Sequence, residues 1–472
     1  MQDLENLFRP RAIAIVGISS NPTTPRRDRF LTPLLDFGFE GQIYPINPKG
    51  GEISGLRILP SIKDIPGAVD YVIASIPAPF CPQLMRDCIA KGVKFVCSYA
   101  SGFSETGEEE GIALEAELAQ IAKSGGSRII GPNCLGTYCP EGHISYRSEF
   151  PKESGPVGYL CQSGGNSIQL VQMVAPRGVR FSKVVSYGNA CDLSECDFLQ
   201  YLTHDPDTEI IALYIEGVKD GQRFINLLTE ASKRKPVVLL KGGCSMAGAM
   251  AVSSHTGALA GNNAIWDALC KQLGIIRVHS LEELGDMLVT FLFMSPVRGR
   301  NMAIVGIGGG ASVLATDDCE SVGLAVPPLP LEIREELLKF TPKAGSSVRN
   351  PIDTQVILSE PNWFLDTIRI ISSWKGIDLV IVLVGPIDVF PSYIGEQSMY
   401  GLMVKAMLEA SIASAKPVAV VVQPGIHPEM YNDMFGAQQE FASAGFPVYP
   451  TMVRAAKAID KFISYHQRKK LS

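Results

Sequence analysis

Short apolar runs rich in β-branched residues alternate with longer segments of helical period along most of the chain. The runs end at Gly, Pro or Asn, as at residues 12–16, 71–76 and 128–130. Continuous apolar strands that alternate with helices are typical of parallel sheets covered by helices on both faces. The pattern therefore predicts an α/β protein built from doubly wound sheets.

The pattern restarts twice, so it predicts three domains. We place them at residues 1–148, 149–296 and 297–472, with a linker-like composition at residues 295–300. The strands expected in the first domain suit a Rossmann-type sheet. A length of 472 residues agrees with this division, because domains commonly have about 150 residues each.

Composition narrows the possible functions. Hydrophobic residues make up 46% of the chain and charged residues 19%, which favours packed cores over disorder. Lys and Arg total 42 against 48 Asp and Glu, and the net charge of -6 leaves no broad basic surface for nucleic acid. The N-terminus is acidic and the first apolar run is short, so we expect neither a secretory leader nor a membrane anchor.

Eleven cysteines are scattered through the expected strands and helices without a C-x-x-C pair. This spacing matches neither a metal cage nor the disulfide framework of a small secreted domain. We therefore expect reduced, mostly buried thiols in a cytoplasmic protein, and no metal site.

The turn after residues 12–16 is the first candidate binding site. Gly17, Ser19 and Ser20 precede an expected helix, whose N-terminus could hold a phosphate through backbone N–H groups. The turn lacks the three glycines of G-x-G-x-x-G, which disfavours a Rossmann dehydrogenase. Taken alone, it is more readily explained as an ordinary βα turn.

Other loops follow the expected strands of the same domain. The carboxyl ends of parallel strands line the ligand crevice of an open sheet, so these loops would converge on one place, where a lysine could bind a ligand phosphate. Ordinary turns and a nucleotide-like ligand explain the set equally well at this point. The residues are Asn47, Lys49, Ile76, Pro77 and Asn133.

Residues 251–261 carry the sharpest chemical signal, a histidine among Ser, Thr, Gly and Ala. Such small neighbours let a backbone or a ligand approach closely. The neutral imidazole of His255 could attack a phosphoryl group and carry it in a labile form. A lone histidine in such a loop is nevertheless more often structural.

Two further motifs change that balance. Glu216 ends an expected strand, where its carboxylate could bond the far imidazole nitrogen of His255 and fix the tautomer. A Gly-Gly turn stands where another strand enters a helix, a geometry that suits phosphate. Alone, these motifs could be a surface carboxylate and a tight turn, but the three together predict a phosphoryl-handling site. The turn comprises Gln162, Ser163, Gly164 and Gly165.

The third domain opens with a similar glycine turn at residues 308–310. This turn could be structural or could admit a partner or a phosphate. Asn350, Pro351 and Asp353 follow a polar loop and could contact a partner chain or end a helix.

The order of these motifs resembles the α subunit of ADP-forming (NDP-forming) acyl-CoA synthetases, relatives of succinyl-CoA synthetase. The likeness spans nearly the whole chain, and the Ser-His-Thr-Gly loop and the Gly-Pro-Asn-Cys turn are its most specific parts. The matching segments are residues 17–19, 46–48, 131–136, 162–165, 188–189, 216–217, 254–261 and 350–353.

The resemblance implies a Rossmann-type CoA-binding domain followed by two flavodoxin-like, succinyl-CoA synthetase-like domains. It implies an acid–thiol ligase that interconverts acid, CoA and a nucleoside triphosphate with acyl-CoA, nucleoside diphosphate and phosphate. By position, His255 matches the phosphoryl carrier and Glu216 its supporting carboxylate. The turn at residues 162–165 matches the phosphate and acyl site. The positions matching the CoA site are Gly17, Ser19, Ser20, Asn47, Lys49, Ile76, Pro77 and Asn133.

The resemblance also implies partners. Family members bind ATP or GTP with Mg2+ mainly in an ATP-grasp module, either a separate subunit or a fused segment, and no candidate for it occurs here. We therefore expect a heterodimer or heterotetramer with an ATP-grasp subunit, acting on a small carboxylic acid. Arg26, Arg27 and Ala190 depart from the common family pattern, which is compatible with an unusual acid such as a charged or sulfonated one.

One alternative from another class is a non-catalytic regulatory module that binds CoA or acyl-CoA. His255 argues against it, because a sensor needs no phosphoryl carrier. A Rossmann dehydrogenase ranks last, since no acidic residue ends the second expected strand where a ribose would bind.

Overall fold

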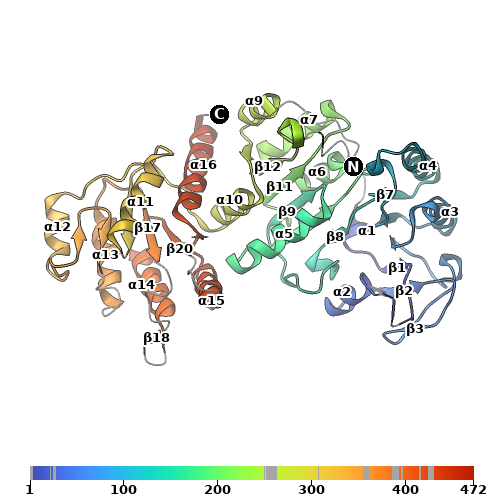
Figure 1. Ribbon diagram of the computed structural model, residues 1–472, viewed down its shortest axis with the longest axis horizontal. Coiled ribbons are helices and arrows are strands. Elements are labelled where there is room, and N and C mark those ends of the chain that lie inside the picture. The colour runs from blue at the N-terminus through green and yellow to red at the C-terminus, as the bar shows by residue number, and fades with distance from the viewer. Residues whose placement is uncertain are drawn as a thin grey trace. The chain divides into compact units, whose positions relative to one another are not determined.

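Three sheets of five or six strands carry the fold (Figure 1). The computed structural model describes residues 4–21, 23–24, 28–248, 250, 263–306, 308–354, 361–384, 393–394, 397–413, 416–423 and 430–471. Contacts group the chain into two compact units, one of Met1–Gln172 with Arg180–Leu284 and one of Met173–Val179 with Gly285–Ser472.

The first sheet is parallel, with the order β2-β1-β5-β6-β7. The run predicted at residues 12–16 is β1, which is buried along its whole length and pairs with β2 on one side and β5 on the other. This reversal of strand order opens a crevice at the carboxyl ends of β1 and β5, where ligands bind in such folds. The strands are β1 (Ala12–Val16), β2 (Gln42–Ile46), β5 (Tyr71–Ala74), β6 (Phe95–Ser98) and β7 (Arg128–Ile130).

Helices α3 and α4 pack together over this sheet. They bury Met85, Cys88 and Leu118 against strand residues such as Val72 and Val96, which builds the apolar core of the domain. The helices are α1 (Glu5–Phe8), α2 (Leu31–Asp36), α3 (Cys81–Lys91) and α4 (Glu109–Gly125), and a hairpin is formed by β3 (Glu52–Ile53) and β4 (Leu56–Arg57).

The second sheet has the order β13-β12-β11-β9-β10-β8. Its edge strand β8 is antiparallel to β10 and directly follows the first sheet in the chain, so the turn at residues 131–135 links the two sheets. The strands are β8 (Gly136–Tyr138), β9 (Val157–Cys161), β10 (Phe181–Ser186), β11 (Ile210–Ile215), β12 (Val237–Lys241) and β13 (Ile276–Val278).

Five helices are described around the second sheet. Helix α6 begins with a capping box. The Ser194 hydroxyl oxygen accepts a hydrogen bond from a backbone N–H group of the first turn, and the Asp197 carboxylate accepts one from the Ser194 backbone N–H group. The helices are α5 (Gly164–Val174), α6 (Glu195–His204), α7 (Gly221–Arg234), α9 (Asn263–Leu273) and α10 (Leu281–Phe293).

The third sheet has the order β15-β16-β14-β17-β20-β21. All residues of β14, β17 and β20 are buried, so helices cover both faces, as the continuous apolar runs predict. The strands are β14 (Met302–Gly306), β15 (Ser347–Val348), β16 (Ile352–Asp353), β17 (Leu379–Val384), β20 (Val418–Val422) and β21 (Val448–Tyr449), with a hairpin of β18 (Tyr393–Ile394) and β19 (Gln397–Ser398).

The helices around the third sheet are α11 (Gly309–Glu320), α12 (Leu331–Leu337), α13 (Pro361–Ser373), α14 (Met399–Ala413), α15 (Met430–Ser443) and α16 (Met452–Leu471). The polar motif at residues 350–353 has an internal role here. Asn350 accepts a bond from Ile304 N at 3.0 Å, and Asp353 accepts one from Gly308 N at 2.7 Å. The motif therefore bonds to the middle of β14 and to the residue that precedes α11.

The three sheets agree with the predicted α/β class and with its Rossmann-type and flavodoxin-like parts. The boundaries at residues 148 and 296 stay predictions. No helix in the described ranges combines the length and the apolar character needed to cross a bilayer. The eleven cysteines all lie in those ranges, and all are free thiols, nine of them buried.

Candidate functional site

The turn after β1 is pressed against the turn after β5. Gly17 has a φ of +103°, and a Cβ atom there would lie 2.1 Å from the Ser75 carbonyl oxygen, so only glycine fits. The same imagined atom would lie 3.1 Å from Ile76 Cγ2. Ser19 Oγ lies 3.2 Å from Thr24 Oγ1, which folds the turn back on itself.

The loop after β2 joins this group. Asn47 Nδ2 donates to the Ile18 carbonyl at 2.5 Å, and Asn47 Oδ1 accepts from Lys49 N at 3.0 Å. The Lys49 side chain is exposed, as are Ser20 and Pro77. The structure thus brings seven of the eight predicted CoA positions to one edge of the first sheet, and three of them are exposed. Asn133, the eighth, follows β7.

Asn133 lines a pocket of about 410 Å³ together with the predicted phosphate and acyl residues. We call it the strand-edge pocket, because its walls come from turns after β6, β7, β9 and β10. Its lining residues are Tyr99, Asn133, Cys134, Leu135, Gln162, Ser163, Gly164, Gly165, Ile168, Gly188 and Asn189.

The N-terminus of α5 forms one wall of the strand-edge pocket. Ser163 caps this helix, since its Oγ accepts from Asn166 N at 3.3 Å and its carbonyl from Ser167 N at 3.1 Å. A Cβ at Gly165 would meet only Ser163 Oγ, at 3.9 Å, so the surface here is open to a ligand. The helix dipole and the first backbone N–H groups favour an anion at this wall.

Gln162 connects this wall to Glu216. Its Oε1 accepts from the backbone N–H groups of Glu216 at 2.8 Å and Gly217 at 3.1 Å. Two hydrogen bonds therefore join the turns after β9 and β11. Burial raises the pKa of the neighbouring Cys161 thiol to about 12, so this thiol stays neutral and donates to the Ser163 carbonyl.

Glu216 is buried, with 6% of its surface exposed, so the surface-carboxylate alternative is wrong. Its Oε1 accepts from the Tyr214 hydroxyl at 3.0 Å, whereas Oε2 is buried and has no hydrogen-bond partner among the described residues. Lys241 Nζ donates to the Glu216 carbonyl at 2.7 Å, and burial lowers the pKa of this lysine. A buried carboxylate oxygen without a donor needs one from outside this local group.

His255 lies outside the described residues, together with the rest of the predicted loop at residues 251–261. The described chain resumes at α9. The placement of the predicted phosphoryl carrier therefore stays a prediction.

Six of the pocket residues had no site role predicted from the sequence, and Tyr99 and Asn189 are two of them. The Asn189 Nδ2 group donates to Glu105 at 2.6 Å and to Glu115 at 2.8 Å, which turns its amide nitrogen toward these carboxylates. Asn189 was part of a matched motif, and this was the signal available for it. Tyr99 carried no signal in the sequence.

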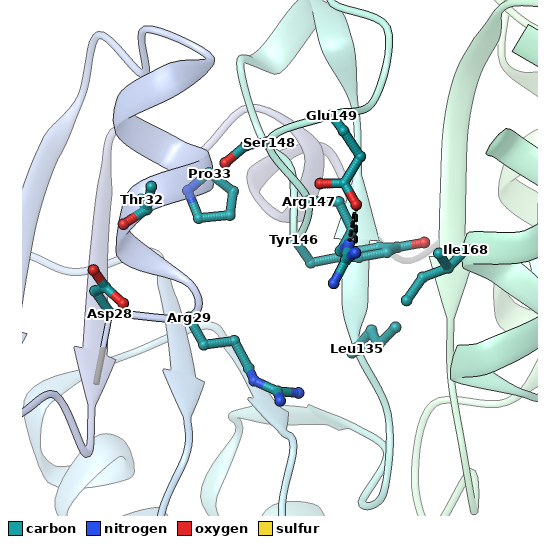
Figure 2. A pocket seen from close by; sticks show the side chains of 10 residues that line it. All are labelled: Asp28, Arg29, Thr32, Pro33, Leu135, Tyr146, Arg147, Ser148, Glu149 and Ile168. Carbon is teal, nitrogen blue, oxygen red and sulfur yellow. Dashed lines mark hydrogen bonds and ion pairs between the residues drawn. The ribbon is translucent and has the colours of Figure 1, made fainter. Parts of the chain in front are cut away.

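A second pocket of about 410 Å³ adjoins the first, because Leu135 and Ile168 line both. Figure 2 shows it between the start of α2 and the segment at residues 146–149. We call it the Arg29 pocket. Arg147 Nε donates to Glu149 at 2.7 Å across its rim.

Comparison with known proteins agrees with this architecture. Residues 11–140 match a family model described as a CoA binding domain, and residues 154–291 match one described as a succinyl-CoA ligase like flavodoxin domain. The chain is 33% identical, over 99% of its length and 98% of the relative, to the α subunit of ADP-forming acetate–CoA ligase I of Pyrococcus furiosus. The chain belongs to the ADP-forming acyl-CoA synthetase family.

Two other matches support the assignment to this acyl-CoA synthetase family. The α subunit of ligase II from the same organism is 34% identical, with 96% of each chain covered. A dinucleotide-forming acetyl-coenzyme A synthetase of Ca. Korarchaeum cryptofilum, solved with phosphate and ADP, superposes with a TM-score of 0.82, 34% identity and full coverage of both chains.

Membership confirms several predictions. The chain is an acid–thiol ligase subunit of the NDP-forming type, which uses CoA and a nucleotide, and the non-catalytic regulatory module is not favoured. The designation of its relatives as α subunits implies a partner subunit.

Proposed function

We propose that this chain handles CoA and acyl phosphate in an NDP-forming acid–CoA ligase, and that His255 carries phosphoryl groups to and from a partner subunit. The observation that carries the proposal is the strand-edge pocket, in which the α5 N-terminus adjoins the Gln162–Glu216 connection. The partner would be an ATP-grasp subunit in a heterodimer or heterotetramer. It would bind ATP or GTP, with Mg2+ neutralising the charge of the nucleotide phosphates.

In the ligase direction, the imidazole nitrogen of His255 attacks the terminal phosphorus of the nucleotide, and the nucleoside diphosphate leaves. The substrate carboxylate then takes this phosphoryl group and forms an acyl phosphate. The CoA thiol loses its proton and attacks the acyl carbon, and inorganic phosphate leaves. The net reaction converts acid, CoA and nucleoside triphosphate into acyl-CoA, nucleoside diphosphate and phosphate.

The residues of the chain would share this work. Ser163, Gly164 and Gly165 would bind the phosphate of the acyl phosphate at the α5 N-terminus, where the dipole favours negative charge. Glu216 would accept a hydrogen bond from the far nitrogen of His255 and so stabilise the positive charge that phosphorylation leaves on the ring. Its Oε2, which has no hydrogen-bond partner among the described residues, supports this role.

The CoA-binding edge would be the set of turns around Gly17. The backbone there is shaped by close contacts that exclude a side chain at position 17, and Lys49 is exposed to meet a phosphate of CoA. We also propose a cytoplasmic setting, which agrees with eleven free thiols.

Reconstitution tests the proposal. The purified chain alone should form no nucleoside diphosphate, whereas the chain with an ATP-grasp subunit should form it over many turnovers only when both CoA and an acid are present. The measurement is coupled detection of nucleoside diphosphate together with acyl-CoA by mass spectrometry. Equal turnover by the isolated chain would contradict the two-subunit proposal.

Replacing Glu216 with Gln should lower kcat of the complex by about 10- to 100-fold, the range expected for a hydrogen bond to a charged group. Gln keeps the shape and can still accept from Tyr214, so the change mainly removes charge. Steady-state kinetics and the half-life of phosphorylated His255 would measure it. The matched control is Glu195→Gln, another buried carboxylate of the same unit, which should leave both unchanged.

A further inference from the structure

Arg29 is a cation without a carboxylate partner in the described part of the chain. Its guanidinium lies 4.7 Å from the centre of the Tyr99 ring, and its Nη1 group donates to the Tyr99 hydroxyl. The tyrosine oxygen accepts this bond, so the tyrosine O–H hydrogen can be donated elsewhere. The pair therefore offers hydrogen-bond donors and a positive charge to a ligand.

Two other charged side chains of the Arg29 pocket, Arg147 and Glu149, are paired with each other. Glu149 accepts from Arg147 and also from Gln172 Nε2 at 3.1 Å, so Arg147 and Glu149 largely neutralise each other. Figure 2 shows the Asp28 carboxylate and the Arg29 guanidinium pointing in different directions, and hydroxyls of Thr32 and Ser148 near the same cavity. Among the described residues that line this pocket, Arg29 is thus the cation most available to a ligand.

The Arg29 pocket continues from the proposed acyl site. Leu135 and Ile168 line both pockets, and Tyr99, which holds Arg29, lines the strand-edge pocket. An acid whose carboxylate lies at the α5 N-terminus could pass its carbon chain along these two apolar side chains. Its far end would then reach the guanidinium.

We infer that the acid substrate carries a second anionic group, a carboxylate or a sulfonate, at the end remote from the reacting carboxylate, and that Arg29 binds it. The inference rests on the proposed function. A two-carbon acid would leave a second cavity of about 410 Å³ and its cation unused. Guanidinium binds carboxylate and other oxyanions with paired, charge-assisted bonds, which suits this class of acid.

The test compares acids of matched length on the reconstituted complex. Succinate and 3-sulfopropanoate should give a higher kcat/KM than butanoate. Arg29→Leu should raise KM for the two dianions by about 10- to 100-fold and leave KM for CoA and for butanoate unchanged. Arg29→Lys should recover part of the loss. The matched control is Arg147→Leu, which removes a cation that Glu149 already neutralises and should change KM by less than about threefold.

The outcomes separate the inference from the proposed function. Equal use of butanoate and the dianions, with no effect of Arg29→Leu, would overturn the inference and leave the ligase intact. A rise in KM for CoA alone would also overturn it, because Arg29 would then bind a CoA phosphate. Calorimetric titration of CoA into Arg29→Leu checks that the variant is folded. Absence of nucleoside diphosphate with every acid would refute the proposed function and the inference together.

Discussion

Replacing His255 with Ala is expected to lower kcat of the ligase complex by at least about 1,000-fold, the scale seen when a reacting nucleophile is removed. Alanine offers no nitrogen to take the phosphoryl group. The complex should also lose the acid-labile, base-stable phosphate that forms when the wild type is incubated with labelled nucleoside triphosphate. CoA binding should persist, since the predicted CoA positions lie in other segments of the chain.

A matched control is His279→Ala in the same unit, where the histidine is exposed and follows β13. This variant should keep both the activity and the labelled phosphate. If His255→Ala retained full ligase activity, the phosphoryl-carrier assignment would be wrong, and direct transfer between the nucleotide and the acid would have to replace it.

Replacing Asp286 with Ala should destabilise the second unit by about 3–5 kcal/mol, the cost of removing one partner from a buried ion pair. Asp286 Oδ1 lies 2.8 Å from Arg177 Nη2, and Arg454 binds the same carboxylate through two bonds of 2.6 and 2.8 Å. The Arg177 side chain is only 4% exposed, and burial lowers the pKa of this guanidinium. Without Asp286 the charge on Arg177 would be buried and uncompensated.

Urea unfolding monitored by tryptophan fluorescence would measure this loss, because Trp363 and Trp374 report on the second unit and Trp266 on the first. The matched control is Asp460→Ala in the second unit. Asp460 pairs with Arg300 at 2.7 Å, but both side chains are about one-third exposed, so the expected loss is below about 1 kcal/mol. Equal midpoints for Asp286→Ala and the wild type would show that the buried pair does not support the unit.

Sequence reasoning located most of the central strands. The runs at residues 12–16, 71–76 and 128–130 are observed as β1, β5 and β7, because apolar, β-branched composition is a local property of a buried strand. The edge strand β8 was missed. It has three residues, and its pairing with β10 joins segments more than 40 residues apart, which no local pattern reports.

The candidate site was predictable in part. The Gly-Gly turn and the Gly17 turn follow strands, so their place at a sheet edge follows from the parallel topology. The burial of Glu216 does not follow from its position in the sequence, since a carboxylate after a strand is commonly exposed. Its burial depends on Tyr214 and on the Gln162 side chain, which is 54 residues away.

By itself, the sequence determined the α/β class and membership of the acyl-CoA synthetase family, because strand and helix periods and the order of motifs are written along the chain. Only the tertiary structure decided, for the described residues, which polar groups are buried without hydrogen-bond partners and which cations lack a carboxylate partner. The contact between Arg29 and Tyr99 joins residues that are 70 positions apart in the sequence, and it holds the positive charge of Arg29 at the Arg29 pocket. Such contacts arise from the packing of distant segments, where side-chain shape and burial decide which groups meet.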